Sequence, residues 1–165
     1  MTLTRGELIR TGFAGSVLLA AAGCAHRATA PVDTQRHETI AAIAGVMLAG
    51  ALPSSGQARA NALAEAVRGV DIAIAGLPPV VQREISQLFA LLNFPLTRVL
   101  AAGVMSSWRD ASPREIETFL RQWRYSGILL FRSGYDALHQ LIMAGWYGNT
   151  LAWSRIGYGG PPKIA

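Results

Sequence analysis

Residues 112–123 read SPREIETFLRQW, and this stretch predicts an α-helix more clearly than any other part of the chain. Ser112 can accept hydrogen bonds from the N–H groups of the first turn, Pro113 suits the first helical position, and Glu115 completes a capping box. Apolar side chains then recur at i, i+3, i+4 and i+7: Ile116, Phe119, Leu120 and Trp123. Since such a face has to be buried, the stretch predicts a helical core.

The same helical spacing continues on both sides of this stretch. It is carried in residues 58–75 by Leu63, Val67, Val70 and Ile74, in residues 79–92 by Val81, Ile85, Leu88, Phe89 and Leu92, and near the C-terminus by Phe131, Tyr135, Leu138, Ile142 and Trp146. A short helix is expected at about 97–104. We find no alternating strand pattern. The chain is therefore predicted to be all-α, a compact bundle of five or six helices with an irregular aromatic, Gly- and Pro-containing C-terminal tail.

Residues 39–52, TIAAIAGVMLAGAL, are apolar or small throughout. A transmembrane helix needs about 20 such residues, so this segment predicts a buried first helix that starts near Asp33 or Thr34. A second membrane anchor is the alternative. Further along, Glu65, Arg68 and Asp71 are three residues apart and are expected to pair on the outside of their helix.

Composition limits the class of protein. The chain has 165 residues, of which 51% are hydrophobic and 15% charged, which predicts one folded domain. The net charge is +5, and the cations form no run, which argues against a nucleic-acid partner. The single cysteine, Cys24, excludes an internal disulfide framework, a Cys-rich zinc site, a Cys-ligated iron–sulfur cluster and a covalent haem attachment motif.

The N-terminus predicts export. Arg5 and Arg10 form a basic start, and the uncharged run 11–23 has the length of a signal-peptide core rather than of a membrane span. Residues 4–10, TRGELIR, are similar to a twin-arginine signal in which Gly6 replaces the second arginine. We assign residues 1–23 to an export signal; the twin-arginine and general secretory routes both remain open.

Cys24 closes the sequence AAGC at 21–24, which resembles a bacterial lipobox. In such a site Cys24 is acylated and becomes the first residue of the mature protein. Alternatively, it is a small hydrophobic residue beside an ordinary cleavage point. Residues 24–33 are expected to be a tether, and 34–165 a single helical domain.

No pattern of catalytic residues emerges. His26 lies in the tether, His37 is expected to be solvated, and His139 lies three residues after Asp136 with no nucleophile nearby. Metal-ligand spacing, a Gly-x-Ser-x-Gly elbow and a phosphate loop are all missing from the sequence. We predict that this chain is not an enzyme and that it binds no cofactor or metal itself.

The C-terminal segment 145–165 is unusually aromatic. It holds Trp146, Tyr147, Trp153 and Tyr158 among glycines and prolines. Trp and Tyr are enriched in the cores of protein interfaces. These four residues are our candidates for a partner interface, and packing against the chain's own helices is the alternative for each.

Several blocks in the C-terminal half resemble one family. They are Phe119-Leu120-Arg121-Gln122-Trp123, Tyr135-Asp136-Ala137-Leu138-His139-Gln140-Leu141, and Ala144-Gly145-Trp146-Tyr147-Gly148-Asn149 with Trp153 and Ile156-Gly157-Tyr158-Gly159-Gly160-Pro161-Pro162. Residues 74–95 also look familial, and the likeness covers about 38–162. The family is the gluconate 2-dehydrogenase subunit 3 family, the small subunits of membrane-associated, flavin-dependent sugar and alcohol dehydrogenases.

The resemblance implies a non-catalytic accessory subunit of a bacterial periplasmic complex. The partner would be a large subunit of the glucose–methanol–choline type that carries FAD, and a cytochrome c subunit with haem c could accept its electrons. Small subunits of this kind carry the export signal for the folded flavoprotein. Lipid on Cys24 would add attachment to the inner membrane. The alternative is a free-standing exported helical lipoprotein that acts as a binding module.

Overall fold

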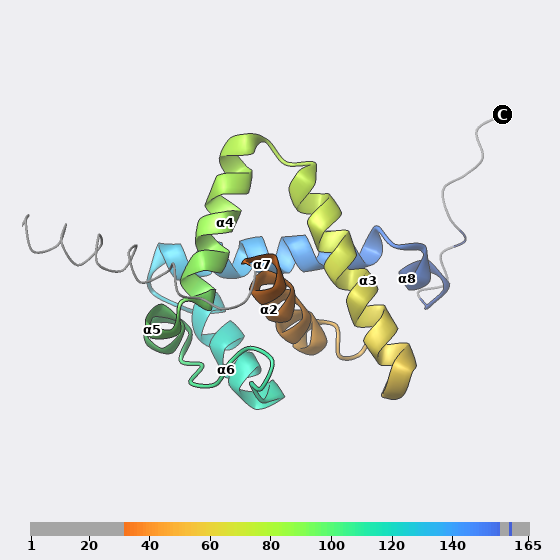
Figure 1. Ribbon diagram of the computed structural model, residues 1–165, viewed down its shortest axis with the longest axis horizontal. Coiled ribbons are helices and arrows are strands. Elements are labelled where there is room, and N and C mark those ends of the chain that lie inside the picture. The colour runs from red at the N-terminus through yellow and green to blue at the C-terminus, as the bar shows by residue number, and fades with distance from the viewer. Residues whose placement is uncertain (1–31, 156–158, 160–165) are drawn as a thin grey trace, which may run out of the picture. The chain divides into compact units, whose positions relative to one another are not determined.

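The computed structural model describes residues 32–155 and residue 159, and Figure 1 shows how its helices are arranged. All regular secondary structure in this part is helical, which confirms the predicted all-α class. The six longer helices are α2 (Val32–Met47), α3 (Gly56–Ala75), α4 (Pro79–Asn93), α6 (Pro113–Arg124), α7 (Leu129–Tyr147) and α8 (Thr150–Arg155). Between α4 and α6 the chain forms α5 (Pro95–Thr97) and the π-helical turn η2 (Arg98–Ala102).

Helix α6 begins as its sequence predicts. Ser112 Oγ accepts a hydrogen bond from the Glu115 N–H at 3.3 Å, and Glu115 Oε2 accepts one from the Ser112 N–H at 2.9 Å. The side-chain and then the backbone hydrogen bond from Ser112 lower the pKa of Glu115. The four apolar residues that define the inner face are all buried: Ile116, Phe119, Leu120 and Trp123.

Removing this cap gives a first prediction. Ser112→Ala should lower the free energy of unfolding by about 1 kcal/mol, because the orphan N–H groups of α6 lose their acceptor. The control is Ser86→Ala, which removes an exposed hydroxyl that bonds only to the Gln82 carbonyl within α4. Denaturant unfolding of the two variants measures the difference.

The same cap has a pH signature. Because the folded-state pKa of Glu115 lies below its ordinary value of 4.5, its carboxylate stabilises the fold above that value and loses this effect as the pH falls through the lowered pKa. The stability gap between the wild type and Ser112→Ala should therefore narrow in acid. A stability gap that stays constant from neutral pH to about pH 3, well below the ordinary pKa of a glutamate, would contradict the capping box as its source.

The closest contact between helices joins α3 to α7, which cross in Figure 1. A Cβ on Gly69 would lie 2.2 Å from the Gly145 carbonyl oxygen, and a Cβ on Gly145 would lie 2.6 Å from the Val70 backbone nitrogen. Only glycine at both positions allows the two backbones to touch. Ala62, Ala66, Val67 and Val70 form the buried face of α3.

Helix α2 is held by polar as well as apolar contacts. Arg68 pairs with Glu65 as expected, but Asp71 turns to α2 instead. Its carboxylate accepts from Arg36 Nη2 at 3.1 Å and lies 2.7 Å from His37 Nε2. His37, expected to be solvated, keeps 42% of its side chain exposed, and the packing of α2 on α3 also brings an acidic partner to it.

Two local predictions also differ from the structure. The short helix expected at about 97–104 is α5 followed by the π-helical turn, and it ends at Gly103 with φ of 68°. The tail expected to be irregular holds α8. The Trp153 indole N–H donates to the Tyr147 carbonyl at 2.8 Å, a contact that lies between α7 and α8.

Candidate functional site

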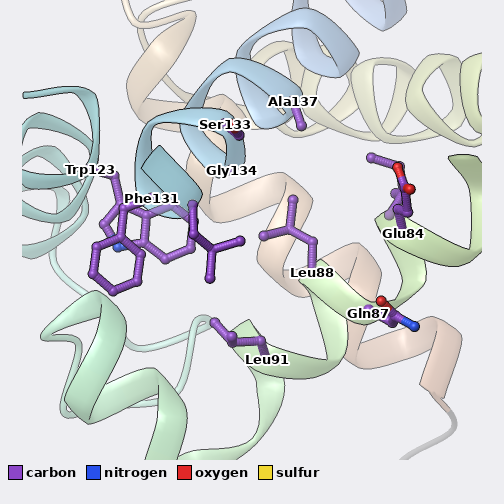
Figure 2. Close-up of a pocket in the computed structure, with 11 residues that line it drawn as sticks. Glu84, Gln87, Leu88, Leu91, Trp123, Phe131, Ser133, Gly134 and Ala137 are labelled. Carbon is purple, nitrogen blue, oxygen red and sulfur yellow. The ribbon is translucent and has the colours of Figure 1, made fainter. Parts of the chain in front are cut away.

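An apolar groove lies between α4 and α7 and has a volume of about 410 Å³ (Figure 2). It is lined by Glu84, Ile85, Gln87, Leu88 and Leu91 of α4, by Trp123 of α6, and by Leu130, Phe131, Ser133, Gly134 and Ala137 of α7. Its volume falls within the range of about 300–1,000 Å³ that is typical of ligand clefts. Because most of the lining is apolar, the groove suits an apolar occupant.

The two walls of the groove run in opposite directions. Figure 2 shows Glu84 near Ala137 at one end, and Leu91 near Trp123 and Phe131 at the other. The first end is therefore polar at its margin and the second is aromatic. Leu88 points into the space between the two ends in Figure 2.

The aromatic end of the groove is rigidly built. Trp123 stacks on Phe131 with ring centroids 5.2 Å apart, and its indole N–H donates to the Ala101 carbonyl at 2.7 Å. A Cβ on Gly134 would lie 2.5 Å from Trp123 Cζ3, so glycine is required for the indole to rest against α7. A preformed surface of this kind loses little conformational entropy when it binds.

The groove contains few polar side chains. Among its lining residues the one ionisable side chain is Glu84, and the remaining polar groups are the Gln87 amide and the Ser133 hydroxyl. A second, smaller hollow of about 250 Å³ is lined by Ala102, Gly103, Ser112, Arg114, Glu115, Thr118 and Gln122. There Ser112 and Glu115 already serve the cap of α6.

The predicted interface residues have different surroundings. Trp146 is 1% exposed and belongs to the core. It therefore packs against the chain's own helices, which was the alternative to a partner interface. Tyr147 is 45% exposed, and Trp153 is half-buried against the core. Tyr158 lies outside the described residues, as do Cys24, Arg5 and Arg10 of the predicted signal.

The block that carries the family resemblance, residues 144–149, has clear structural roles. Gly145 provides the contact with α3, and Trp146 fills the core beside it. The Asn149 amide donates to Glu65 Oε2 of α3 at 3.2 Å. This block therefore fixes the C-terminal end of α7 to α3.

The other residues considered for chemistry stay separate. His139 is exposed and its ring stacks on Tyr135, with centroids 5.9 Å apart. Among the described residues no group of three or more His, Cys, Asp and Glu side chains is placed to hold a metal ion. His26 lies outside the described part of the chain.

Sequence reasoning missed the groove and the surface next to it. Ile128, Leu129 and Leu130 are more than half exposed where α7 begins. The sequence did contain a signal for this surface. Successive residues of a helix point about 100° apart, so one buried face cannot hold three consecutive side chains. Three adjacent large apolar residues at a helix start therefore indicate an exposed apolar surface.

Comparisons with known proteins identify no relative of this chain. No protein-family model matches the sequence, and searches of curated proteins and of solved structures find no match. Within the described residues no single helix is long and apolar enough to cross a membrane. Taken together, Pro79–Asn93 and Pro95–Ala102 reach the required length and hydropathy, with a bend of 78° between them.

Proposed function

We propose that this chain is the non-catalytic small subunit of a flavin-dependent sugar or alcohol dehydrogenase of the glucose–methanol–choline type. It binds and stabilises the large subunit and assists its export to the bacterial periplasm. The observation that carries the proposal is the open apolar groove between α4 and α7. The resemblance of residues 119–123 and 144–149 to the gluconate 2-dehydrogenase subunit 3 family names the partner.

The groove accounts for binding without chemistry. Hot spots of protein interfaces are bulky side chains that fill water-free pockets. Apolar side chains of the large subunit would enter between Leu88 and Phe131, against the Trp123 indole. FAD would belong to the large subunit and haem c to a further cytochrome subunit, and neither would be held by this chain.

The N-terminal residues complete the proposed role. Residues 1–23 would direct the folded complex through the membrane, and lipid on Cys24 would then hold it at the periplasmic surface. One acyl chain gives only weak, reversible attachment, with an association constant of about 10⁴ M⁻¹. A second contact with the membrane would therefore strengthen the anchor.

Blocking the groove tests the proposal. Ser133→Arg places a long cation at the mouth of the groove and should lower affinity for the large subunit about 30-fold, as expected for a disrupted interface hot spot. Gln140→Arg is the matched control, because it adds the same charge to the same helix at an exposed residue outside the groove lining. Both variants are measured by co-purification with the large subunit, and its export is followed in the same cells.

Two results would overturn the proposal. One is a large subunit that is exported normally in cells lacking this chain. The other is a chain that purifies alone although the large subunit is co-expressed. The volume of the groove would then favour the second candidate function, a free-standing lipoprotein that binds a small apolar molecule.

A further inference from the structure

The chain reversal between α6 and α7, residues 121–132, exposes large apolar side chains; we name it the α6–α7 corner. Tyr125, Ile128, Leu129 and Leu130 are 56–73% exposed there. Large exposed apolar patches on soluble proteins mark interaction sites. Of these four residues, only Leu130 also lines the groove.

The charged side chains within residues 118–135 are all arginines, and the exposed carboxylates of Glu117 and Asp136 flank this range. Arg121, Arg124 and Arg132 are exposed, and no Asp or Glu occurs anywhere in residues 118–135. The Arg124 guanidinium lies over the Tyr125 ring at 5.5 Å, and Arg132 Nη1 donates to the Ser126 carbonyl at 2.6 Å. These contacts hold cations beside the exposed apolar side chains.

A second segment with exposed apolar side chains is hydrogen-bonded to the end of α6. The Trp123 indole N–H, at the end of α6, bonds to the Ala101 carbonyl of the π-helical turn. That turn and its neighbouring residues expose Leu96, Leu100 and Met105. Residues 85–109 also contain no Asp or Glu. One hydrogen bond therefore links this segment to the end of α6, and Glu115 lines the hollow beside its last residues, Ala102 and Gly103.

We infer that the α6–α7 corner inserts into the interfacial region of an anionic phospholipid bilayer. The argument is charge complementarity. Apolar and aromatic side chains enter the acyl boundary while arginines meet lipid phosphates, as in other proteins that bind the membrane interface. The proposal does not depend on the identity of the protein partner, and it supplies a contact beyond lipid on Cys24.

The corner shares Trp123, Leu130 and Phe131 with the groove, but its exposed apolar residues other than Leu130 lie outside the groove. Tyr125, Ile128 and Leu129 take no part in the groove lining. A protein segment can fill a concave groove, whereas a bilayer contacts side chains that stand out from the surface. The two surfaces can therefore be tested with separate substitutions.

A fluorescent probe at the corner tests the inference in the full chain. In a Cys24→Ser background, Leu129→Cys carries an environment-sensitive fluorophore, and Ile72→Cys carries the same label on α3. Ile72 is a matched control, because it is a large apolar residue that is 74% exposed on another helix. Both chains keep the same N-terminus, so its contribution to vesicle binding is common to them.

With vesicles of phosphatidylglycerol and phosphatidylethanolamine, the probe at 129 should shift its emission to shorter wavelength and be quenched by brominated acyl chains. The probe at 72 should not respond. Changing Arg121, Arg124 and Arg132 to Gln should raise the lipid concentration needed for the response about 100-fold, at roughly fivefold for each arginine.

Three results would overturn the inference. They are a silent probe at 129, an equal response at 129 and 72, and an equal response to vesicles of phosphatidylcholine alone. Protection of the probe at 129 by the large subunit, with none by vesicles, would assign the corner to the protein partner instead. A failure of vesicle binding leaves the groove test with Ser133→Arg unaffected, so the two proposals fail separately.

Discussion

Gly145→Ala should destabilise the chain by at least about 2 kcal/mol, and Gly69→Ala should do the same. Alanine favours a helix over glycine by about 1 kcal/mol, which opposes the effect. The added Cβ, however, would lie 2.2–2.9 Å from backbone atoms of the facing helix, and backbone cannot rotate away as a side chain can. Overpacking of a tight contact costs about 1–3 kcal/mol or more. The cost of pushing α3 away from α7 should therefore exceed the gain in helix propensity, so the free energy of unfolding should fall.

Gly45→Ala is the matched control for this prediction. Gly45 lies within α2, and a Cβ there would be 3.9 Å from its nearest neighbour, Arg59 Nη2, which is ordinary van der Waals contact. The Gly45→Ala substitution should leave the free energy of unfolding unchanged or raise it by up to about 1 kcal/mol. The denaturant midpoint should therefore fall for Gly69→Ala and Gly145→Ala, whereas it should stay the same or rise for Gly45→Ala.

The double variant adds an independent check. If Gly69→Ala already separates the helices, Gly145→Ala should then cost less than it does alone, because both act on one contact. Full additivity would show that the two glycines act separately. A midpoint for Gly145→Ala equal to that of the wild type would contradict the close approach itself.

Much of the fold could be predicted from local patterns. The capping box at Ser112 and Glu115 and the buried face of α6 follow from residue types and spacing alone, since the partners lie within two turns of helix. The start of α4 at Pro79 was readable for the same reason, whereas the first helix, expected to include residues 39–52, ends at Met47. These are interactions in which the sequence neighbours are also the spatial neighbours.

Contacts between distant segments could not be predicted in this way. Periodicity shows which face of α3 is apolar, but it does not show that α7 crosses it at Gly69. The crossing selects the small residues Ala62 and Ala66 for burial, whereas Leu63 is only partly buried. The partnership of Asp71 with Arg36 and His37 also depends on how α2 is placed against α3.

The candidate site was hidden for a related reason. Glu84, Leu88 and Leu91 lie about 40 to 50 residues from the α7 residues that line the groove with them, so the groove exists only once α4 lies against α7. The apolar spacing that includes Leu88 predicts a helix. It does not show whether Leu88 is buried in the core or lines a groove, because both give the same periodicity. Gly134 had no signal of its own, although the position of Trp123 depends on it.

Trp146→Ala should destabilise the chain in isolation by about 3–5 kcal/mol, the range for removal of a large aromatic side chain from a core. Trp146 is 1% exposed and lies beside Gly145, where α7 meets α3. The cavity left by the indole would be bordered by backbone held in the helix crossing, and it could not easily collapse. Trp146→Phe keeps part of the side-chain volume, so it should lower the free energy of unfolding substantially less than Trp146→Ala does.

Tyr147→Ala is the neighbouring comparison, and its expected behaviour is the opposite. Its side chain is 45% exposed, and the bond from the Trp153 indole goes to the Tyr147 backbone carbonyl, which the substitution keeps. The unfolding free energy of the isolated chain should change by less than about 0.5 kcal/mol. Any effect of Tyr147→Ala should therefore be in affinity for the proposed large subunit.

Measuring unfolding and partner affinity for both variants separates the two roles of the aromatic block. A core role for Trp146 requires that its stability loss be the same with and without the partner. If Trp146→Ala instead left the isolated chain as stable as the wild type and weakened only the complex, its indole would belong to the interface. In that case the packing of α7 on α3 would have to rearrange when the partner binds, because a side chain buried in this arrangement cannot reach another protein.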